Sequence, residues 1–328
     1  MLPTELNGET ITLPKTDRHT IVIVTGKELR HKRFAYRLLQ EFDDRVLAWY
    51  ELDNSVTPHN NGLEKNQKTK QDDQHSSSKI EKIIDILTRE LPENIKKYGF
   101  SHTLDRIKSL GSDLYYRLFF IRKTDKKMAE AEEKLFALEV EKLQKTTRLI
   151  PIKIDPDDLH TAEFVDEIKK HDPYFFLTLS GPLYKKPLLE SIRGAAINQH
   201  AGHSPLLKGS NTIHWALYHR ELNHVSSTVH ITNTGADAGQ ILRRSNPCIF
   251  PTDTIETVFL RSVALGTELM ISSVKEIISN KEVIVFDQPK SAGMTYLNKR
   301  YNLQIAKAVA RDFNAGWLRV ALNEKRSF

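Results

Sequence analysis

Cysteine is almost absent from this chain of 328 residues, since Cys248 is its single example. One cysteine cannot form an internal disulfide, and it has no second thiol with which to hold a structural zinc ion. No apolar run approaches the ~18 to 20 residues of a membrane span, and residues 1–20 lack the apolar stretch of a secretory signal. We therefore expect a cytoplasmic protein that does not contact a membrane.

A strong charge of one sign is also missing. The 48 Lys and Arg residues against 42 Asp and Glu give a net charge of +6, and this excess is spread thinly along the chain. A nucleic-acid-binding protein usually shows a clustered basic patch, so we expect no nucleic acid partner. His200, His203 and His214 are close in sequence, but their spacing matches no metal motif, and we expect no metal site.

Short apolar runs alternate with amphipathic segments through most of the chain, which has the length of one large or two modest domains. The alternation predicts strands at 20–26, 45–51, 148–154, 175–180 and 195–198, and helices at 29–42, 155–170 and 182–194. Strands that alternate with helices are typical of a parallel sheet covered by helices. We therefore predict one large α/β domain with a mostly parallel sheet and helices on both faces.

The rest of the chain adds an insertion and a tail to this plan. Residues 57–79 contain one large aliphatic residue and no aromatic, so we predict a flexible insertion. Further helices are predicted at 126–144, 212–222 and 251–277, the last with Asp253 and Glu256 in capping-box spacing. We place the main domain at 1–279 and a small C-terminal extension at 280–328.

Polar residues gather after the strand at 195–198. Asn198 and His200 lie at its carboxyl end, where open α/β sheets bind ligands, and Asp237 follows between two glycines. An amide can stabilise an oxyanion, and a histidine backed by a carboxylate can move a proton near neutral pH. These residue types suit acyl transfer to an amine. Taken singly, each is explained as well by a turn cap, a buried structural histidine or an Asx turn.

A longer pattern runs from Asp172 to Ile241. Its elements are Asn198-Gln199-His200, Pro205 to Gly209, Trp215-Ala216-Leu217, Thr228-Val229-His230 and Asp237-Ala238-Gly239. Five elements in this order resemble the formyltransferases that use 10-formyltetrahydrofolate, a family that includes glycinamide ribonucleotide, methionyl-tRNA and amino-sugar formyltransferases. The resemblance implies the formyltransferase type of Rossmann-like fold for the main domain.

The resemblance also implies roles for single residues. Asn198 and His200 would hold the formyl group and its developing oxyanion, and Asp237 would orient the histidine or relay the amine proton. The co-substrate would be 10-formyltetrahydrofolate, without a metal, and its pterin would lie near three residues of the strand and loop at 175–186. These three are Leu179, Gly181 and Leu183.

For the acceptor we expect a primary amine of a small molecule, in particular an amino sugar carried on a nucleotide, with a homodimer as one assembly to consider. The residues expected to contact its phosphates are Lys185, Lys186, Arg243 and Arg244, with Arg30 to Arg33 as a second anion-binding candidate. Three alternatives stay open: a formyltetrahydrofolate hydrolase, an enzyme like methionyl-tRNA formyltransferase, and a folate-binding protein without activity.

Overall fold

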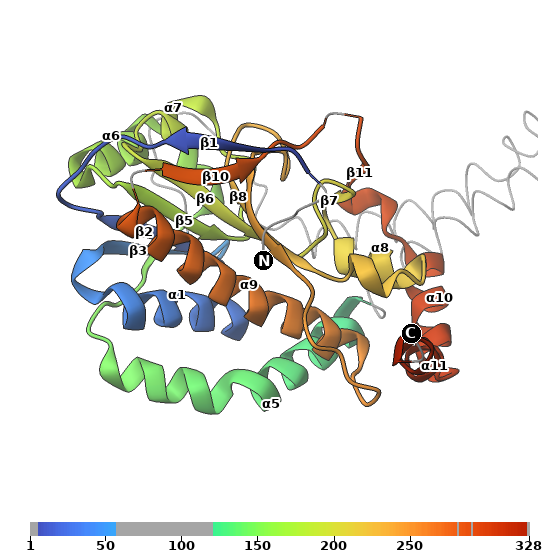
Figure 1. Ribbon diagram of the computed structural model, residues 1–328. Coiled ribbons are helices and arrows are strands. Elements are labelled where there is room, and N and C mark those ends of the chain that lie inside the picture. The colour runs from blue at the N-terminus through green and yellow to red at the C-terminus, as the bar shows by residue number, and fades with distance from the viewer. Residues whose placement is uncertain (1–5, 57–120, 281, 290, 327–328) are drawn as a thin grey trace, which may run out of the picture.

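A nine-stranded sheet runs through the middle of the molecule (Figure 1). The computed structural model describes residues 6–56, 121–280, 282–289 and 291–326. In spatial order the strands are β1 (Gly8–Thr12), β10 (Glu282–Phe286), β9 (Ile241–Ser245), β8 (Ser227–Ile231), β6 (Ala195–His200), β5 (Phe175–Leu179), β2 (Ile21–Thr25), β3 (Val46–Leu52) and β4 (Ile152–Ile154).

Most strands of this sheet point the same way, as predicted. The run from β6 to β4 is paired in parallel throughout. Strands β8 and β10 are antiparallel to both of their neighbours, so these two run against the other seven. The edge strand β1 and the strand β9 were not predicted, because five-residue segments with charged or polar alternation resemble ordinary loops.

Helices cover both faces of the sheet. On one face lie α1 (Leu29–Phe42), α5 (Arg122–Thr146) and α9 (Ile255–Ser279), and on the other lie α6 (Ala162–His171) and the short α7 (Lys186–Leu189). Strand β2 is apolar along its whole length because both of its faces are covered. Ile21 and Ile23 pack toward the first group of helices, whereas Val22 and Val24 pack toward the second.

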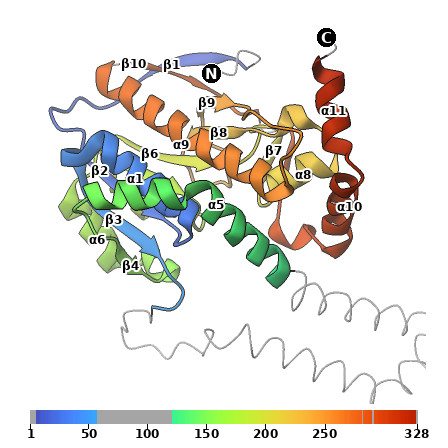
Figure 2. The ribbon, with the colours of Figure 1, turned by 90° about the horizontal axis from the view of Figure 1, so that it is seen from below.

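A third apolar cluster stands at the end of the sheet. It joins the two-stranded pair β7 (Leu207–Gly209) and β11 (Met294–Tyr296) to α8 (Thr212–Tyr218), α10 (Leu303–Asn314) and α11 (Trp317–Arg326). Trp215 of α8 stacks on Tyr296 with ring centroids 4.4 Å apart. Figure 2, turned by a quarter, shows α8, α10 and α11 grouped beside the sheet rather than over it.

The described residues beyond the predicted boundary at 279 are joined to the sheets rather than set apart from them. Strand β10 pairs with β1 along its whole length and touches β9, while β11 pairs with β7. The tail therefore supplies strands to both sheets. The insertion predicted at 57–79 lies outside the described residues.

Element ends also differ from the sequence-based expectation. Helix α9 begins with a capping box of Thr254 and Thr257, not of Asp253 and Glu256. Asp253 instead accepts hydrogen bonds from Arg261 and from the Phe250 N–H, so its carboxylate is already engaged. The helix predicted at 182–194 shrinks to the four residues of α7, because Gly181 and Pro182 lead into an extended loop.

One helix of the described residues, α9, is long and apolar enough by length and composition to cross a membrane. Its window has a mean hydropathy of 1.3, but 61% of it is buried inside the protein. Val263, Met270 and Val274 belong to the core beneath the sheet. Helix α9 therefore has the environment of a core helix.

Gly266 allows α9 to lie close to the sheet. A Cβ at this position would fall 2.2 Å from Ser227 Oγ and 2.3 Å from Gln199 Nε2, closer than atoms approach without a shift. We expect Gly266→Ala to lower the free energy of unfolding by roughly 1–3 kcal/mol, because overpacking outweighs the better helix propensity of alanine. Lys275→Ala on the same helix removes an exposed ion pair with Glu41 and should cost less than about 0.5 kcal/mol. Urea denaturation of both variants checks the difference, and equal midpoints would contradict it.

Candidate active site

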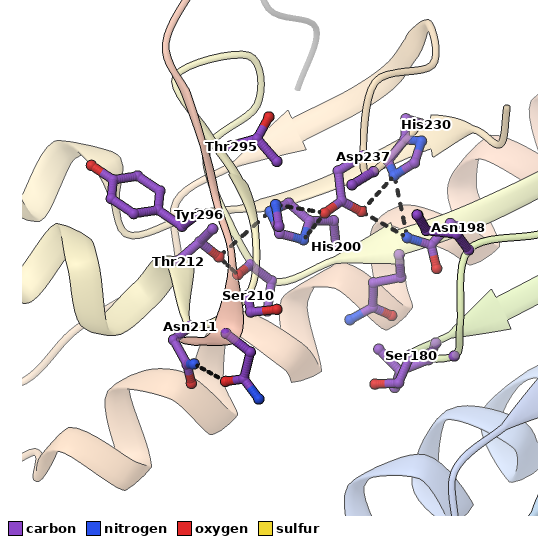
Figure 3. A pocket seen from close by; sticks show the side chains of 18 of the residues that line it. Ser180, Asn198, His200, Ser210, Asn211, Thr212, His230, Asp237, Thr295 and Tyr296 are labelled. Atoms are coloured by element: carbon purple, nitrogen blue, oxygen red, sulfur yellow. Dashed lines mark hydrogen bonds and ion pairs between the residues drawn. The ribbon is translucent and has the colours of Figure 1, made fainter. Parts of the chain in front are cut away.

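A cavity of about 560 Å³ opens where β5 and β6 end (Figure 3). Its volume lies within the range of small-molecule sites, roughly 300–1,000 Å³. Residues from the β5–α7 loop, β6, the β7–α8 turn and the loop after β8 line it, together with residues 295–298 that follow the start of β11. The carboxyl edge of the parallel strands therefore forms one wall, and segments more than 100 residues apart in sequence complete it.

Three neighbouring strands place a row of polar side chains on one face of the sheet. Asn198 of β6 is paired with Thr178 of β5 on one side and with His230 of β8 on the other. The Thr178 hydroxyl donates to Asn198 Oδ1 over 2.8 Å, so the amide Nδ2 points toward His230 Nε2, 3.2 Å away. The amide oxygen thus faces the buried threonine, and the amide nitrogen faces His230.

His200 lies on the same face as Asn198, because side chains two residues apart in a strand point the same way. Strand β6 continues through His200, so both residues belong to the strand itself rather than to the loop after it. The intervening Gln199 points to the opposite face and donates to the Val263 carbonyl of α9 over 2.7 Å. The Asn-x-His spacing therefore delivers two groups to the cavity and one to the core.

Asp237 brings these groups together from a loop after β8. Its Oδ2 lies 3.2 Å from His200 Nδ1 and accepts the Gly209 N–H over 2.9 Å, while its Oδ1 accepts Asn198 Nδ2 over 3.3 Å. His230 Nε2 also lies 3.3 Å from Oδ1. The predicted trio of Asn198, His200 and Asp237 thus meets at one carboxylate.

The charge states of this cluster follow from its surroundings. Burial alone would raise the pKa of Asp237, but the two neighbouring histidines and the N–H of Gly209 hold it well below its usual range. Burial lowers the pKa of His200, and the Asp237 carboxylate opposes this shift only in part. At neutral pH the site therefore holds an ionised carboxylate against a neutral imidazole, which can accept a proton.

The structure places the residues expected near the pterin on the cavity wall. Leu179, Gly181 and Leu183 all line it. Gly181 has φ +134, and a Cβ there would fall 2.5 Å from the Tyr184 hydroxyl oxygen, so the backbone needs glycine at this point. This stretch offers an apolar strip with an exposed backbone.

The residues expected to contact phosphates do not line the cavity. Arg243 forms an ion pair with Glu276 of α9 over 2.5 Å, and Arg244 donates to the Ser204 carbonyl. Lys185 and Lys186 are exposed at the start of α7, outside the lining. In sequence, a Lys or Arg that would contact a ligand cannot be told from one that is paired within the protein, because its partner is not visible.

The basic stretch from Arg30 to Arg33 is engaged with neighbouring helices. Arg30 pairs with the buried Glu132 of α5, and Arg33 donates to Glu139 over 2.8 Å. Arg30 is the one Lys or Arg among the described residues that line the cavity, and its charge is balanced by this partner. An anion site built from the free charge of these arginines is therefore not present.

Several groups at the site were not predicted from sequence. His230 appeared in the Thr-x-His pattern but received no role, although it lies within 3.3 Å of both Asn198 and Asp237. Gln288 donates to the carbonyls of Asp237 and Gly239 over 2.8 and 2.6 Å. Thr178 and His230 could have been found from strand pairing, whereas Gln288 lies 51 residues from Asp237 and gives no local signal.

A model of the family described as Formyl transferase matches residues 104–274, which is more than half of the chain. Asn198, His200, His230 and Asp237 all fall inside that match. The chain therefore belongs to the formyl transferase family, and the resemblance inferred from the five sequence elements is confirmed.

Relatives extend this similarity over part of the chain. The methionyl-tRNA formyltransferase of Thermodesulfovibrio yellowstonii is 28% identical over 142 residues, covering 43% of this chain and 45% of the relative. That of Myxococcus xanthus is 26% identical over 125 residues, covering 38% and 39%. The chain thus spans less than half the length of these relatives.

Among solved structures, a sugar N-formyltransferase from a Shewanella species gives a TM-score of 0.47 at 12% identity, covering 89% of this chain and 87% of that chain. A phosphoribosylglycinamide formyltransferase from Bacillus halodurans gives 0.43 at 14%, covering 80% and 96%.

The lowered pKa of Asp237 predicts an acid-dependent stability. An unfolded aspartic acid titrates near pH 4, so the stabilisation is complete above about pH 4 and is lost as the pH falls toward the lower folded value. We expect Asp237→Asn to be less stable than the wild type at pH 7 and to have a flatter profile below about pH 5. Asp166→Asn, on an exposed face of α6, should reproduce the wild-type profile. Chemical denaturation at several pH values measures this, and parallel profiles for wild type and Asp237→Asn would refute it.

Proposed function

We propose that this protein transfers a formyl group from 10-formyltetrahydrofolate to a primary amine of a small molecule. The observation that carries the proposal is the Asp237 carboxylate joined to Asn198 and His200 on the wall of a ligand-sized cavity. Membership of the formyl transferase family supports the class of reaction. Each step of the transfer can then be assigned to one of these three residues.

The folate would bind along the strip that contains Leu179, Gly181 and Leu183. Leucine side chains suit the faces of a flat ring, and the backbone of the strip can form hydrogen bonds with the ring edge. This placement would put the formyl nitrogen of the folate toward β6, since β5 and β6 are adjacent and both end at the cavity. The formyl carbon would then lie near Asn198 and His200.

The amine would attack the formyl carbon directly. A carbon–nitrogen bond forms to the amine, and the bond from the carbon to N10 of the folate breaks. The Asn198 Nδ2–H would stabilise the oxyanion, and loss of one such donor costs on the order of 3 kcal/mol. The proton lost by the amine passes to N10 with the help of neutral His200, whose ring is held by Asp237.

The cavity favours an acceptor rich in hydroxyl groups. Besides the catalytic cluster, its polar lining consists largely of uncharged hydroxyl and amide side chains, namely Ser210, Asn211, Asn233, Thr295 and Asn298. Such groups can both donate to and accept from sugar hydroxyls. An amino sugar carried on a nucleotide fits this lining, with its phosphates outside the cavity, because Arg30 is already paired.

Two other acceptors remain specific alternatives. The relatives from Thermodesulfovibrio yellowstonii and Myxococcus xanthus are named methionyl-tRNA formyltransferases, so aminoacyl-tRNA belongs in any test. Water in place of the amine would make the same cluster a formyltetrahydrofolate hydrolase. A protein that binds folate and releases no formyl group would be a binding protein of this fold.

Substitution of His200 tests the chemistry. We expect His200→Ala and Asp237→Asn to lower kcat for formyl transfer by about 100-fold or more, with folate affinity nearly unchanged. Both residues assist the transfer of the amine proton to N10 of the folate. His19→Gln is the matched control, since His19 packs on Tyr174 near the amino end of β5. Release of tetrahydrofolate followed by absorbance gives the rates. Wild-type rates in both variants would remove the cluster from the reaction.

A panel of acceptors tests the substrate. We expect tetrahydrofolate release from 10-formyltetrahydrofolate to rise at least about tenfold with a nucleotide-linked amino sugar over the rate without amine. Methionyl-tRNA and glycinamide ribonucleotide complete the panel. Preference for the tRNA, or an amine-independent rate equal to the stimulated one, would replace the proposed acceptor by that alternative.

A further inference from the structure

A second hydrogen-bonded series of side chains meets the same cavity at Ser180, the member of the series that lines it. Ser180 follows directly after β5, and its Oγ lies 3.0 Å from Nε2 of His31 in the first turn of α1. On the other side of the ring, His31 Nδ1 lies 2.6 Å from Oε2 of Glu28, the residue that precedes α1. The order is hydroxyl, imidazole, carboxylate.

The charge states of Glu28 and His31 fix which groups donate and which accept in these hydrogen bonds. The hydrogen bond to His31 lowers the pKa of Glu28 to about 2, so its carboxylate is ionised and accepts Nδ1–H. Burial lowers the pKa of His31, whose ring is only 3% exposed, so the imidazole is neutral and Nε2 carries a lone pair. The Ser180 hydroxyl therefore donates to Nε2, as in an activated serine.

Two backbone features hold the three groups in place. Ser180 has φ 68, a left-handed conformation that residues other than glycine rarely adopt and that is often retained at functional sites. Gly26 lies against the ring, and a Cβ there would fall 2.7 Å from His31 Nδ1 and 3.0 Å from Glu28 Oε2. Glycine at 26 thus leaves the space that the imidazole–carboxylate pair fills.

Ser180 is also accessible to a ligand. It is exposed, it lines the cavity, and Figure 3 shows it on the wall beneath Asn198. The cluster around Asp237 does not include Ser180, and the formyl transfer proposed above assigns no role to Ser180, His31 or Glu28. Ser210 lines the same cavity but has no histidine partner among the described hydrogen bonds, which makes it a natural comparison.

We propose that Ser180, His31 and Glu28 form a second reactive centre in which Ser180 is a nucleophile toward small carboxylic esters. Its Oγ bonds to the carbonyl carbon while its proton passes to His31 Nε2. The carbon–oxygen bond to the alcohol then breaks, and the alcohol leaves with that proton. Water then attacks the acyl carbon and gives a proton to His31 Nε2; the bond from that carbon to Ser180 Oγ breaks, the proton returns from His31 to Oγ, and the acid leaves.

The test uses reagents that contain no folate, so its outcome is independent of the formyl transfer proposed above. The whole protein is treated with a fluorophosphonate, and the modified peptide is identified by mass spectrometry; hydrolysis of p-nitrophenyl acetate is measured in parallel. We expect one adduct, at Ser180, and none at Ser210. Ser180→Ala should abolish the adduct, and Ser210→Ala should react as the wild type does.

The relay is tested by its other members. Glu28→Gln, at a half-exposed position, and His31→Asn should each slow modification of Ser180 by at least about 100-fold, because the hydroxyl loses its base. Ser180→Gly relaxes the left-handed backbone, so it should keep the wild-type melting temperature while losing the adduct, which separates reactivity from folding. An adduct equally fast in Glu28→Gln, or no adduct at Ser180 in the folded wild type, would overturn the proposal.

Discussion

The Asp237 carboxylate is the point on which the arrangement of the candidate site depends. It accepts hydrogen bonds from the Asn198 side chain and the Gly209 N–H and lies against two imidazoles, so β6, β7 and β8 all converge on it. The loop that carries it is held from outside as well, because Gln288 donates to two of its carbonyls. At Gly239 a Cβ would fall 1.6 Å from the Ile231 carbonyl oxygen, so the loop passes over β8 where only glycine fits. A buried carboxylate with this many partners stays ionised and fixes the rings around it.

Two histidine–carboxylate pairs lie at or beside the cavity: His200 with Asp237 in its wall, and His31 with Glu28 behind Ser180. His200 and His31 are both buried, and burial lowers the pKa of each imidazole, while an ionised carboxylate keeps each ring in one orientation. The two differ in what stands on the free side of the ring. His200 Nε2 lies 3.1 Å from the Leu207 carbonyl, whereas His31 Nε2 meets the hydroxyl of Ser180. The first environment suits orientation and proton transfer beside an oxyanion, and the second suits activation of a nucleophile.

The sequence was sufficient for the parts of the fold that are controlled by buried apolar runs. Strands such as β2 and β5 are buried on both faces, so their residues read as continuous apolar segments. The edge strand β1 was harder, since its partners in β10 lie 270 or more residues away in sequence. For the site, the order of five motifs drew attention to Asn198, His200 and Asp237, which the structure brings together, whereas Arg243 and Arg244 lie outside the cavity lining because each has a partner that the sequence does not reveal. Arg243 meets the partly exposed Glu276 and Arg244 meets the carbonyl of the buried Ser204, and both contacts form only when the chain folds.

Sheet register explains why two histidine–carboxylate pairs lie close to one cavity. In the parallel part of the sheet, Thr25 of β2 is opposite Leu179 of β5, and Leu179 is opposite Gln199 of β6. The residues that follow these positions therefore emerge side by side, although they are separated by roughly 20 to 150 residues of chain. This places Ser180 between the start of α1, which carries His31, and the end of β6, which carries His200. A parallel sheet brings unrelated loops to the same edge, so chemistry that has no common sequence motif accumulates there.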